Sequence, residues 1–191
     1  MRPLDADEKR FLLHLARECI ERAVNGQPLP RLDLNALSSE LKAPGASFVT
    51  LTEDGELRGC IGALQAYQPL AADVAEHAVA SALEDYRFPP VSPAEVPMLH
   101  IEVSRLTEPQ PLAYGSAEEL LAKLRPGVDG VILQDGARRA TFLPQVWDEL
   151  PEKERFLSQL CLKMGAPPEL WKRKKLGVSV YQVEEFEEGH A

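Results

Sequence analysis

Two Asp-Gly pairs, Asp54-Gly55 and Asp135-Gly136, each lie between two runs of strand-forming residues. The flanking runs cover 47–51 and 57–64 for the first pair, and 130–134 and 137–143 for the second. This pattern predicts a β-hairpin, because glycine adopts the positive φ angle that a tight hairpin turn needs. Two antiparallel hairpins disfavour a doubly wound parallel sheet, in which single strands alternate with helices.

The same kinds of element follow each hairpin. Helical spacing of apolar residues over 70–85 precedes an alternating, strand-like run over 98–106. After the second hairpin, 145–166 has a helical pattern with a break at Pro151, and 177–186 is predicted as a strand. We therefore predict an α+β fold with an internal duplication of a hairpin-helix-strand unit.

The duplication gives the predicted boundaries. The first unit covers 47–106, the second covers 130–186, and an amphipathic helix over 5–24 precedes both within a single domain. Superposing the two Asp-Gly pairs shifts the chain by 81 residues and places Arg139 on Arg58. The two units have little sequence identity, so the prediction concerns the order of the elements.

Composition limits the class of protein. The chain has 191 residues, 45% of them hydrophobic, and a net charge of -9, which disfavours bulk binding to nucleic-acid backbones. We interpret the basic run "WKRKK" at 171–175 as a solvated turn before the last strand. The sequence has neither a signal-like N-terminal segment nor an apolar run of about 18 residues. We expect a cytoplasmic protein without a membrane segment.

The cysteines predict neither disulfides nor a metal site. Cys19, Cys60 and Cys161 are far apart and form no CxxC pair, and no local Cys/His pair has the spacing of zinc ligands. Cys19 and Cys161 lie in apolar stripes of predicted helices, so we expect inert core thiols there.

The stretch "LRGCIG" at 57–62 carries the most unusual local chemistry. Side chains alternate between the two faces of a strand. The face toward the core would carry Leu57, Gly59 and Ile61, and the opposite face would carry Arg58, Cys60 and Gly62. A guanidinium beside a thiol favours the thiolate, so we expect a partly accessible Cys60 whose pKa Arg58 lowers. Glycines allow a ligand or another segment to approach closely. In the alternative interpretation Cys60 packs as a small hydrophobe and the glycines adjust the strand.

A base for Cys60 could come from the strand over 98–106. His100 and Glu102 share the face opposite its apolar residues, and either could move a proton if that strand lies beside the first hairpin. A lone strand histidine is more often a hydrogen-bonded structural residue. His77, on the helix after the first hairpin, is a further candidate.

Four stretches together resemble a known family. They are "LRGCIG" (57–62), "YRFPPVSPAEV" (86–96), "IEVSRLTEP" (101–109) and "FLPQVWDELPEKERFLSQLCLKMG" (142–165). They are similar to the AMMECR domain family, whose prokaryotic members are called AmmeMemoRadiSam system protein A. The resemblance implies an α+β fold of two subdomains built around antiparallel sheets. It implies no particular activity, because none is settled for the family. One departure is Ala140, where the family leads us to expect a glycine.

The family name also implies partners. It associates these proteins with a Memo-type protein, related to metal-dependent dioxygenases, and with a radical SAM protein. The resemblance therefore implies a shared modification pathway in which any metal or flavin belongs to the associated proteins. No motif in this chain implies a cofactor.

Two functions of different classes remain open at this point. In the first, the chain is an enzyme in which Cys60 is the nucleophile, Arg58 holds an anionic group, and Glu102 or His100 moves protons. In the second, it is a non-catalytic adaptor or ligand-binding module. Both would use a cleft at the LRGCIG strand, with Arg58, Gly59, Gly62 and Arg87 as substrate-binding residues. For the "RFPP" motif we expect Phe88 in the core and Arg87 pointing toward the cleft near Arg58, with a surface Arg87 as the alternative.

Overall fold

The computed structural model describes residues 2–189 and divides the chain into two compact units. The first unit contains the residues up to Thr107 and those from Glu184 onward, and the second contains Glu108–Val183. Each unit has one antiparallel sheet and its own hydrophobic core. The α+β fold class is confirmed.

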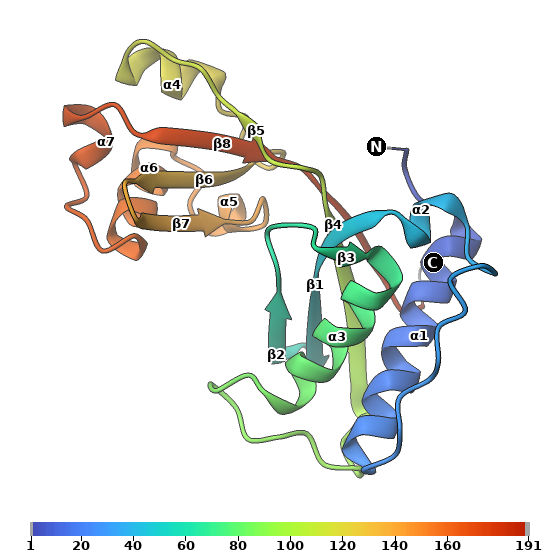
Figure 1. The fold of residues 1–191 in the computed structure, drawn as a ribbon. Coiled ribbons are helices and arrows are strands. Elements are labelled where there is room, and N and C mark those ends of the chain that lie inside the picture. Colours follow the sequence, from blue (N-terminus) through green and yellow to red (C-terminus); the bar gives the residue numbers. More distant parts are fainter. Residues whose placement is uncertain (1, 190–191) are drawn as a thin grey trace. The chain divides into compact units, whose positions relative to one another are not determined.

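The first unit is a sheet covered by helices (Figure 1). Its elements are α1 (Ala6–Val24), α2 (Ser39–Lys42), β1 (Pro44–Glu53), β2 (Glu56–Gly62), β3 (Gln68–Pro69), α3 (Leu70–Leu83), the 3-10 helix η1 (Val96–Met98), β4 (Leu99–Leu106) and β9 (Val183–Glu187). The strand order is β2-β1-β4-β9, and the short β3 also pairs with β1. Helix α3 packs against β1 and β2, and α1 packs against α3 and β4.

Local sequence explains where α1 begins and ends. Asp5 and Glu8 form a capping box, in which each side chain accepts a hydrogen bond from the other residue's backbone N–H. Asn25 caps the other end, and Gly26 follows with a φ of 66°. Between them, Leu12, Cys19 and Ile20 are among the buried residues, so the predicted amphipathic helix is observed.

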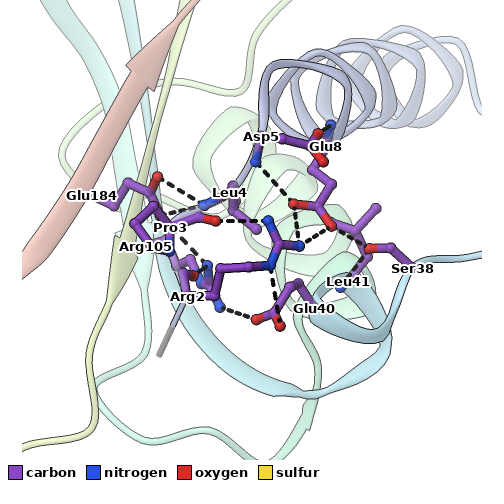
Figure 2. Close-up of polar contacts among 10 residues, drawn as sticks. All are labelled: Arg2, Pro3, Leu4, Asp5, Glu8, Ser38, Glu40, Leu41, Arg105 and Glu184. Carbon is purple, nitrogen blue, oxygen red and sulfur yellow. Dashed lines mark hydrogen bonds and ion pairs between the residues drawn. The ribbon is translucent and has the colours of Figure 1, made fainter.

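The chain start is fixed to the first unit by a group of ion pairs and hydrogen bonds (Figure 2). The buried Arg105 on β4 donates to the carbonyl oxygen of Arg2 and to the carboxylates of Glu40 and Glu184. Glu184, on β9, also accepts the backbone N–H of Leu4 at 3.0 Å. This network connects the beginning of the chain with a strand that lies about 180 residues later in sequence.

The second unit has the same class of structure. Its elements are β5 (Gln110–Pro111), α4 (Ala117–Lys123), β6 (Gly130–Asp135), β7 (Arg138–Phe142), α5 (Val146–Glu149), α6 (Lys153–Lys163), α7 (Leu170–Arg173) and β8 (Gly177–Tyr181). The strand order is β5-β8-β6-β7. Trp147 of α5 stacks on Phe156 of α6 at 3.6 Å between ring centroids. The predicted helix break at Pro151 is confirmed, because α5 ends before it and α6 begins after it.

Both predicted hairpins form, but their turns differ. In the first, Asp54 and Gly55 are the two central residues, with φ angles of 51° and 84°, as a type I′ turn requires. In the second, Asp135 is the last residue of β6 and pairs with Arg138, so the central residues are Gly136 and Ala137. Only Gly136 has a positive φ, which is the pattern of a type II′ turn.

The two sheets share part of their strand order. The first hairpin strand lies between its partner and a later strand in both units, as β2-β1-β4 and as β7-β6-β8. An origin by internal duplication stays a prediction. The single strand predicted over 177–186 is wrong, because β8 pairs with β6 in the second unit whereas β9 belongs to the sheet of the first. An alternating pattern identifies strand-forming residues but not the strand with which they pair.

Candidate functional site

A β-bulge changes the side-chain alternation in the LRGCIG strand. Gly59 lies opposite Leu51 and Leu57 lies opposite Thr52, so Arg58 is an extra residue between two pairs. A bulge shifts the following side chains to the other face. Leu57 is therefore 42% exposed, which corrects the prediction that it faces the core.

The two glycines of the motif allow close packing within the protein. A Cβ added to Gly59 would lie 2.1 Å from the backbone oxygen of Ser81 on α3, and one added to Gly62 would lie 2.4 Å from the Phe48 ring. The Ser81 hydroxyl accepts the N–H of Ile61 and donates to the carbonyl oxygen of Val49. Gly59 therefore allows α3 to lie directly on β2. The substrate-binding role of both glycines stays a prediction.

Burial dominates the chemistry of Cys60. Burial raises the pKa of the Cys60 thiol, and the hydrogen bond from Thr50 and the charge of Arg87 offset only part of this rise. The prediction of a lowered pKa is wrong, since the opposing cation is Arg87 rather than Arg58 and burial outweighs it. Burial also raises the pKa of Cys161, and that of Cys19 to about 11, as expected of core thiols.

An ion pair covers the backbone of Cys60. Strand β2 is an edge of the first unit's sheet among the described residues. The buried Asp85 accepts the Cys60 N–H at 2.9 Å, and its carboxylate accepts two hydrogen bonds from the Arg87 guanidinium, at 2.9 and 2.6 Å. These bonds, led by those from Arg87, hold the pKa of Asp85 well below its usual range. Arg87 also donates to the Cys60 carbonyl oxygen at 3.4 Å.

A second ion pair attaches the loop over residues 84–95, which we call the proline loop, to the bulge. Arg58 donates to Glu95 at 2.9 Å and to the carbonyl oxygen of Pro89 at 2.9 Å. Glu95 also accepts the backbone N–H of Ser92, and the hydrogen bonds from Ser92 and Arg58 lower the pKa of Glu95 to about 2. Both arginines that the sequence suggested for substrate binding are thus engaged with acids of the proline loop.

Phe88 does not reach the core. It is half-buried, and the Arg87 guanidinium carbon lies 5.4 Å from its ring centroid. This corrects the prediction that Phe88 anchors the loop in the core. Arg87 does reach the first hairpin, as predicted, because its guanidinium contacts Cys60 and Asp85 with a side chain that is 43% exposed. The apolar anchor of the loop is instead Val91, which is 3% exposed in the core of the first unit, and the two ion pairs add to its attachment.

The predicted bases, His100 and Glu102, lie on β4, which is separated from the Cys60 strand β2 by β1. Thr50 is paired with Cys60 on one side and with Glu102 on the other, so all three share a face. The backbones of Cys60 and Glu102 are about 10 Å apart, because two strand spacings separate them. Burial, followed by the charge of Glu187, raises the pKa of Glu102. His100 contacts Glu187 at 2.9 Å. The catalytic roles of Cys60, Glu102 and His100 stay predictions.

His77 belongs to a buried polar cluster. Its Nδ1 lies 3.2 Å from Asp73, whose carboxylate also accepts a hydrogen bond from Ser47 at 2.6 Å. Asp73 is fully buried, and its Oδ1 has no partner among the described residues. This cluster lies inside the first unit between β1 and α3.

Several residues that shape the candidate site were not predicted from the sequence. Asp85, Glu95, Ser81 and Thr50 make the contacts that shape the site, and of these only Glu95 lies within one of the four family stretches. Asp85 and Glu95 flank the "RFPP" motif, which is the only signal that could have indicated them. In residues 2–189, no group of three or more His, Cys, Asp or Glu side chains could hold a metal ion. No described helix is long and apolar enough to cross a membrane.

The proline loop and η1, which follows it, also expose apolar side chains. Tyr86 is 94% exposed, and Met98, at the end of η1, is 54% exposed. Leu57, on β2 beside the bulge, is 42% exposed. The site thus combines internally paired charges with exposed aromatic and aliphatic groups.

These features define an α+β protein of two antiparallel units, with a salt-bridged loop on the edge strand of the first. The chain belongs to the AMMECR1 family, whose model matches residues 13–186. A protein of Methanothermobacter thermautotrophicus is 38% identical over 187 residues, which are 97% of each chain. A protein of Thermococcus gammatolerans is 40% identical over 190 residues, covering 93% of this chain and 89% of that protein.

A solved structure supports the same assignment. The crystal structure of the uncharacterized protein PH0010 from Pyrococcus horikoshii matches with a TM-score of 0.84 at 36% identity. The match covers 94% of this chain and 91% of the other. The resemblance inferred from the four sequence stretches is therefore confirmed.

Proposed function

We propose that the protein is a non-catalytic adaptor that docks a partner protein through the proline loop and strand β2. In this proposal it acts with the Memo-type and radical SAM proteins of the modification pathway that the family name suggests. The observation that carries the proposal is the contrast between Tyr86, which is 94% exposed, and the neighbouring charges, which are paired within the protein.

The paired charges argue against catalysis at the LRGCIG strand. Arg58 and Arg87 are paired with Glu95 and Asp85, so an anionic substrate would meet cations whose charge is already compensated unless it displaced a bonded carboxylate. Displacement leaves a buried carboxylate without its partner, which is costly for Asp85. The raised pKa of Cys60 also leaves less thiolate near neutral pH than an ordinary cysteine has.

The exposed groups favour protein binding. Tyrosine and methionine are enriched in protein interfaces, where an aromatic ring supplies a large contact area with few rotatable bonds. Prolines at 89, 90 and 93 and the two ion pairs restrict the loop before binding. Such preorganisation reduces the entropy lost on association.

The test is binding of purified protein to the Memo-type and radical SAM proteins of the same organism. We expect Tyr86→Ala to weaken binding about tenfold or more, because a buried interface tyrosine commonly contributes that much. Tyr67→Ala is the matched control, since Tyr67 is 59% exposed and lies outside the proline loop. Cys60→Ser should leave the affinity unchanged.

Two results would contradict the proposal. One is wild-type affinity in Tyr86→Ala for a partner that does bind. The other is a Cys60→Ser variant that binds the partner with unchanged affinity but abolishes turnover in the reconstituted pathway. That result would favour the enzyme hypothesis, with Cys60 as the nucleophile.

A further inference from the structure

Strand β2 is an edge of the first unit's sheet in the part of the chain that the structure describes. In an antiparallel pair, the N–H and C=O of one residue both point either toward the partner strand or away from it. Both groups of Cys60 point away from β1, because they bond to Asp85 and Arg87 of the proline loop. An edge strand whose outward groups are free is a template on which another strand can pair.

The side chains of Asp85 and Arg87 stand where the backbone groups of a neighbouring strand would stand. The Asp85 carboxylate accepts the Cys60 N–H at 2.9 Å, as a strand carbonyl would. The Arg87 guanidinium donates to the Cys60 carbonyl oxygen at 3.4 Å, as a strand N–H would. Two hydrogen bonds between guanidinium and carboxylate, at 2.9 and 2.6 Å, fix the two side chains to each other. A strand that approached β2 at Cys60 would have to displace this ion pair.

The proline loop covers this edge without becoming a new edge. The two prolines at 89–90 have no backbone N–H. The backbone N–H groups of Arg87 and Phe88 are donated to the side chain and the carbonyl oxygen of Asp85, at 3.2 and 3.0 Å. None of these four residues therefore offers a free backbone donor to a further strand, so the sheet does not continue past the loop.

The bulge at Arg58 acts in the same direction. It lies two residues before Cys60 and interrupts the regular pairing of β2. A bulge on an edge strand hinders the approach of a further strand, because it bends and twists the edge. Arg58 also donates to Glu95 and to the carbonyl oxygen of Pro89, both at 2.9 Å, which holds the proline loop against this part of the strand. The same loop thus covers two nearby positions of the edge.

We propose that Asp85 and Arg87 form an edge cap, which prevents β2 from pairing with β2 of a second copy of the chain. The geometry favours a second copy because an antiparallel pair about a two-fold axis at Cys60 is self-complementary. Each Cys60 would donate its N–H to the carbonyl oxygen of the other, so both groups that the cap covers would be satisfied. This inference goes beyond the adaptor function, which uses the exposed Tyr86 rather than the groups bonded to β2.

Sedimentation velocity of the full chain tests the proposal. The uncapped variant, Asp85→Ala/Arg87→Ala, should self-associate about tenfold or more tightly than the wild type, because the two-fold pair forms two hydrogen bonds with groups that the variant leaves uncovered. Circular dichroism checks its fold. Hydrogen exchange measured on the segment 57–62 locates the contact. This segment should gain protection with protein concentration in the uncapped variant, and its protection should be independent of concentration in the wild type.

Arg125→Ala/Asp129→Ala is the matched control. Like Arg87 and Asp85, these two residues join an exposed arginine to a buried aspartate at 2.6 Å. They lie in the second unit, where Asp129 precedes β6, an inner strand of its sheet. This variant should therefore lose an equivalent ion pair without gaining self-association. Tyr86→Ala, which tests the adaptor function, should also leave self-association unchanged, so the two proposals fail separately.

Arg87→Ala is the second variant, for the case in which loss of the buried Asp85 prevents folding. It uncovers only the Cys60 carbonyl oxygen and should self-associate about threefold more tightly than the wild type.

Three results would overturn the proposal. The first is a folded uncapped variant, or Arg87→Ala where the uncapped variant does not fold, that associates no more tightly than the wild type. The second is equal association by the control, which would mean that any lost ion pair of this kind exposes adhesive surface. The third is association without added protection of the segment 57–62, which would place the contact elsewhere.

Discussion

At the scale of single residues, the LRGCIG stretch is governed by competition between burial and charge. Cys60 lies on an edge strand beside two arginines, yet the positive charge that acts on it comes from Arg87 and is weakened by Asp85. Because a desolvated thiolate is unfavourable, the thiol form is stabilised. Proximity of a cation in sequence is therefore a poor guide to thiol reactivity when that cation is already paired.

This balance predicts the alkylation behaviour of Cys60. In the native protein its reaction should require higher pH than that of an ordinary cysteine, because the raised pKa reduces the thiolate fraction. Arg87→Gln should move the profile to still higher pH, since it removes the opposing cation and leaves the charge of Asp85. Arg58→Gln should leave the profile unchanged. Mass spectrometry of each labelled cysteine against pH measures this, and a shift with Arg58→Gln alone would contradict it.

At the scale of elements, the packing of α3 on β2 depends on one missing side chain. A Cβ at Gly59 would meet the backbone oxygen of Ser81 at 2.1 Å, and a backbone atom cannot rotate away as a side chain can. The hydroxyl of Ser81 also bridges β1 and β2, so a shift of the helix would strain those two hydrogen bonds.

We therefore expect Gly59→Ala to lower the free energy of unfolding by about 2 kcal/mol or more, as overpacking of a fitted core does. Gly177→Ala is the control, because a Cβ there would lie 3.5 Å from its nearest neighbour, Gln134. Urea unfolding of both variants measures the difference. Equal stability of Gly59→Ala and the wild type would mean that α3 is not seated on β2 as described.

The elements were largely predictable from sequence, and the reasons for the failures are local. Asp-Gly pairs and Pro151 act through backbone angles of the same few residues, so hairpins and a helix break could be read directly. The bulge at Arg58 and the division of 177–186 between two sheets depend on pairing with distant strands. The ion pairs of Arg58 and Arg87 likewise depend on where the proline loop lies, which a single sequence does not reveal.

At the scale of the whole molecule, the first unit is discontinuous in sequence. Its sheet includes β9, which follows the entire second unit, so the chain must return to complete it. Glu184 of β9 accepts the Leu4 N–H and pairs with Lys9 and with the buried Arg105. The carboxylate therefore joins three distant parts of the first unit, and its loss should affect that unit selectively.

We expect Glu184→Gln to destabilise the first unit by about 2 kcal/mol, because hydrogen bonds to charged groups contribute about this much. The buried Arg105 would then keep only Glu40 as an acidic partner among the described residues. Glu56→Gln, an exposed change at the start of β2, should have little effect. Native-state hydrogen exchange resolves the two units: protection should fall in α1, β1 and β4, and stay unchanged in β6, β7 and β8. Equal losses in both units would mean that they unfold as one cooperative body, in which the contacts of Glu184 stabilise the second unit as much as the first.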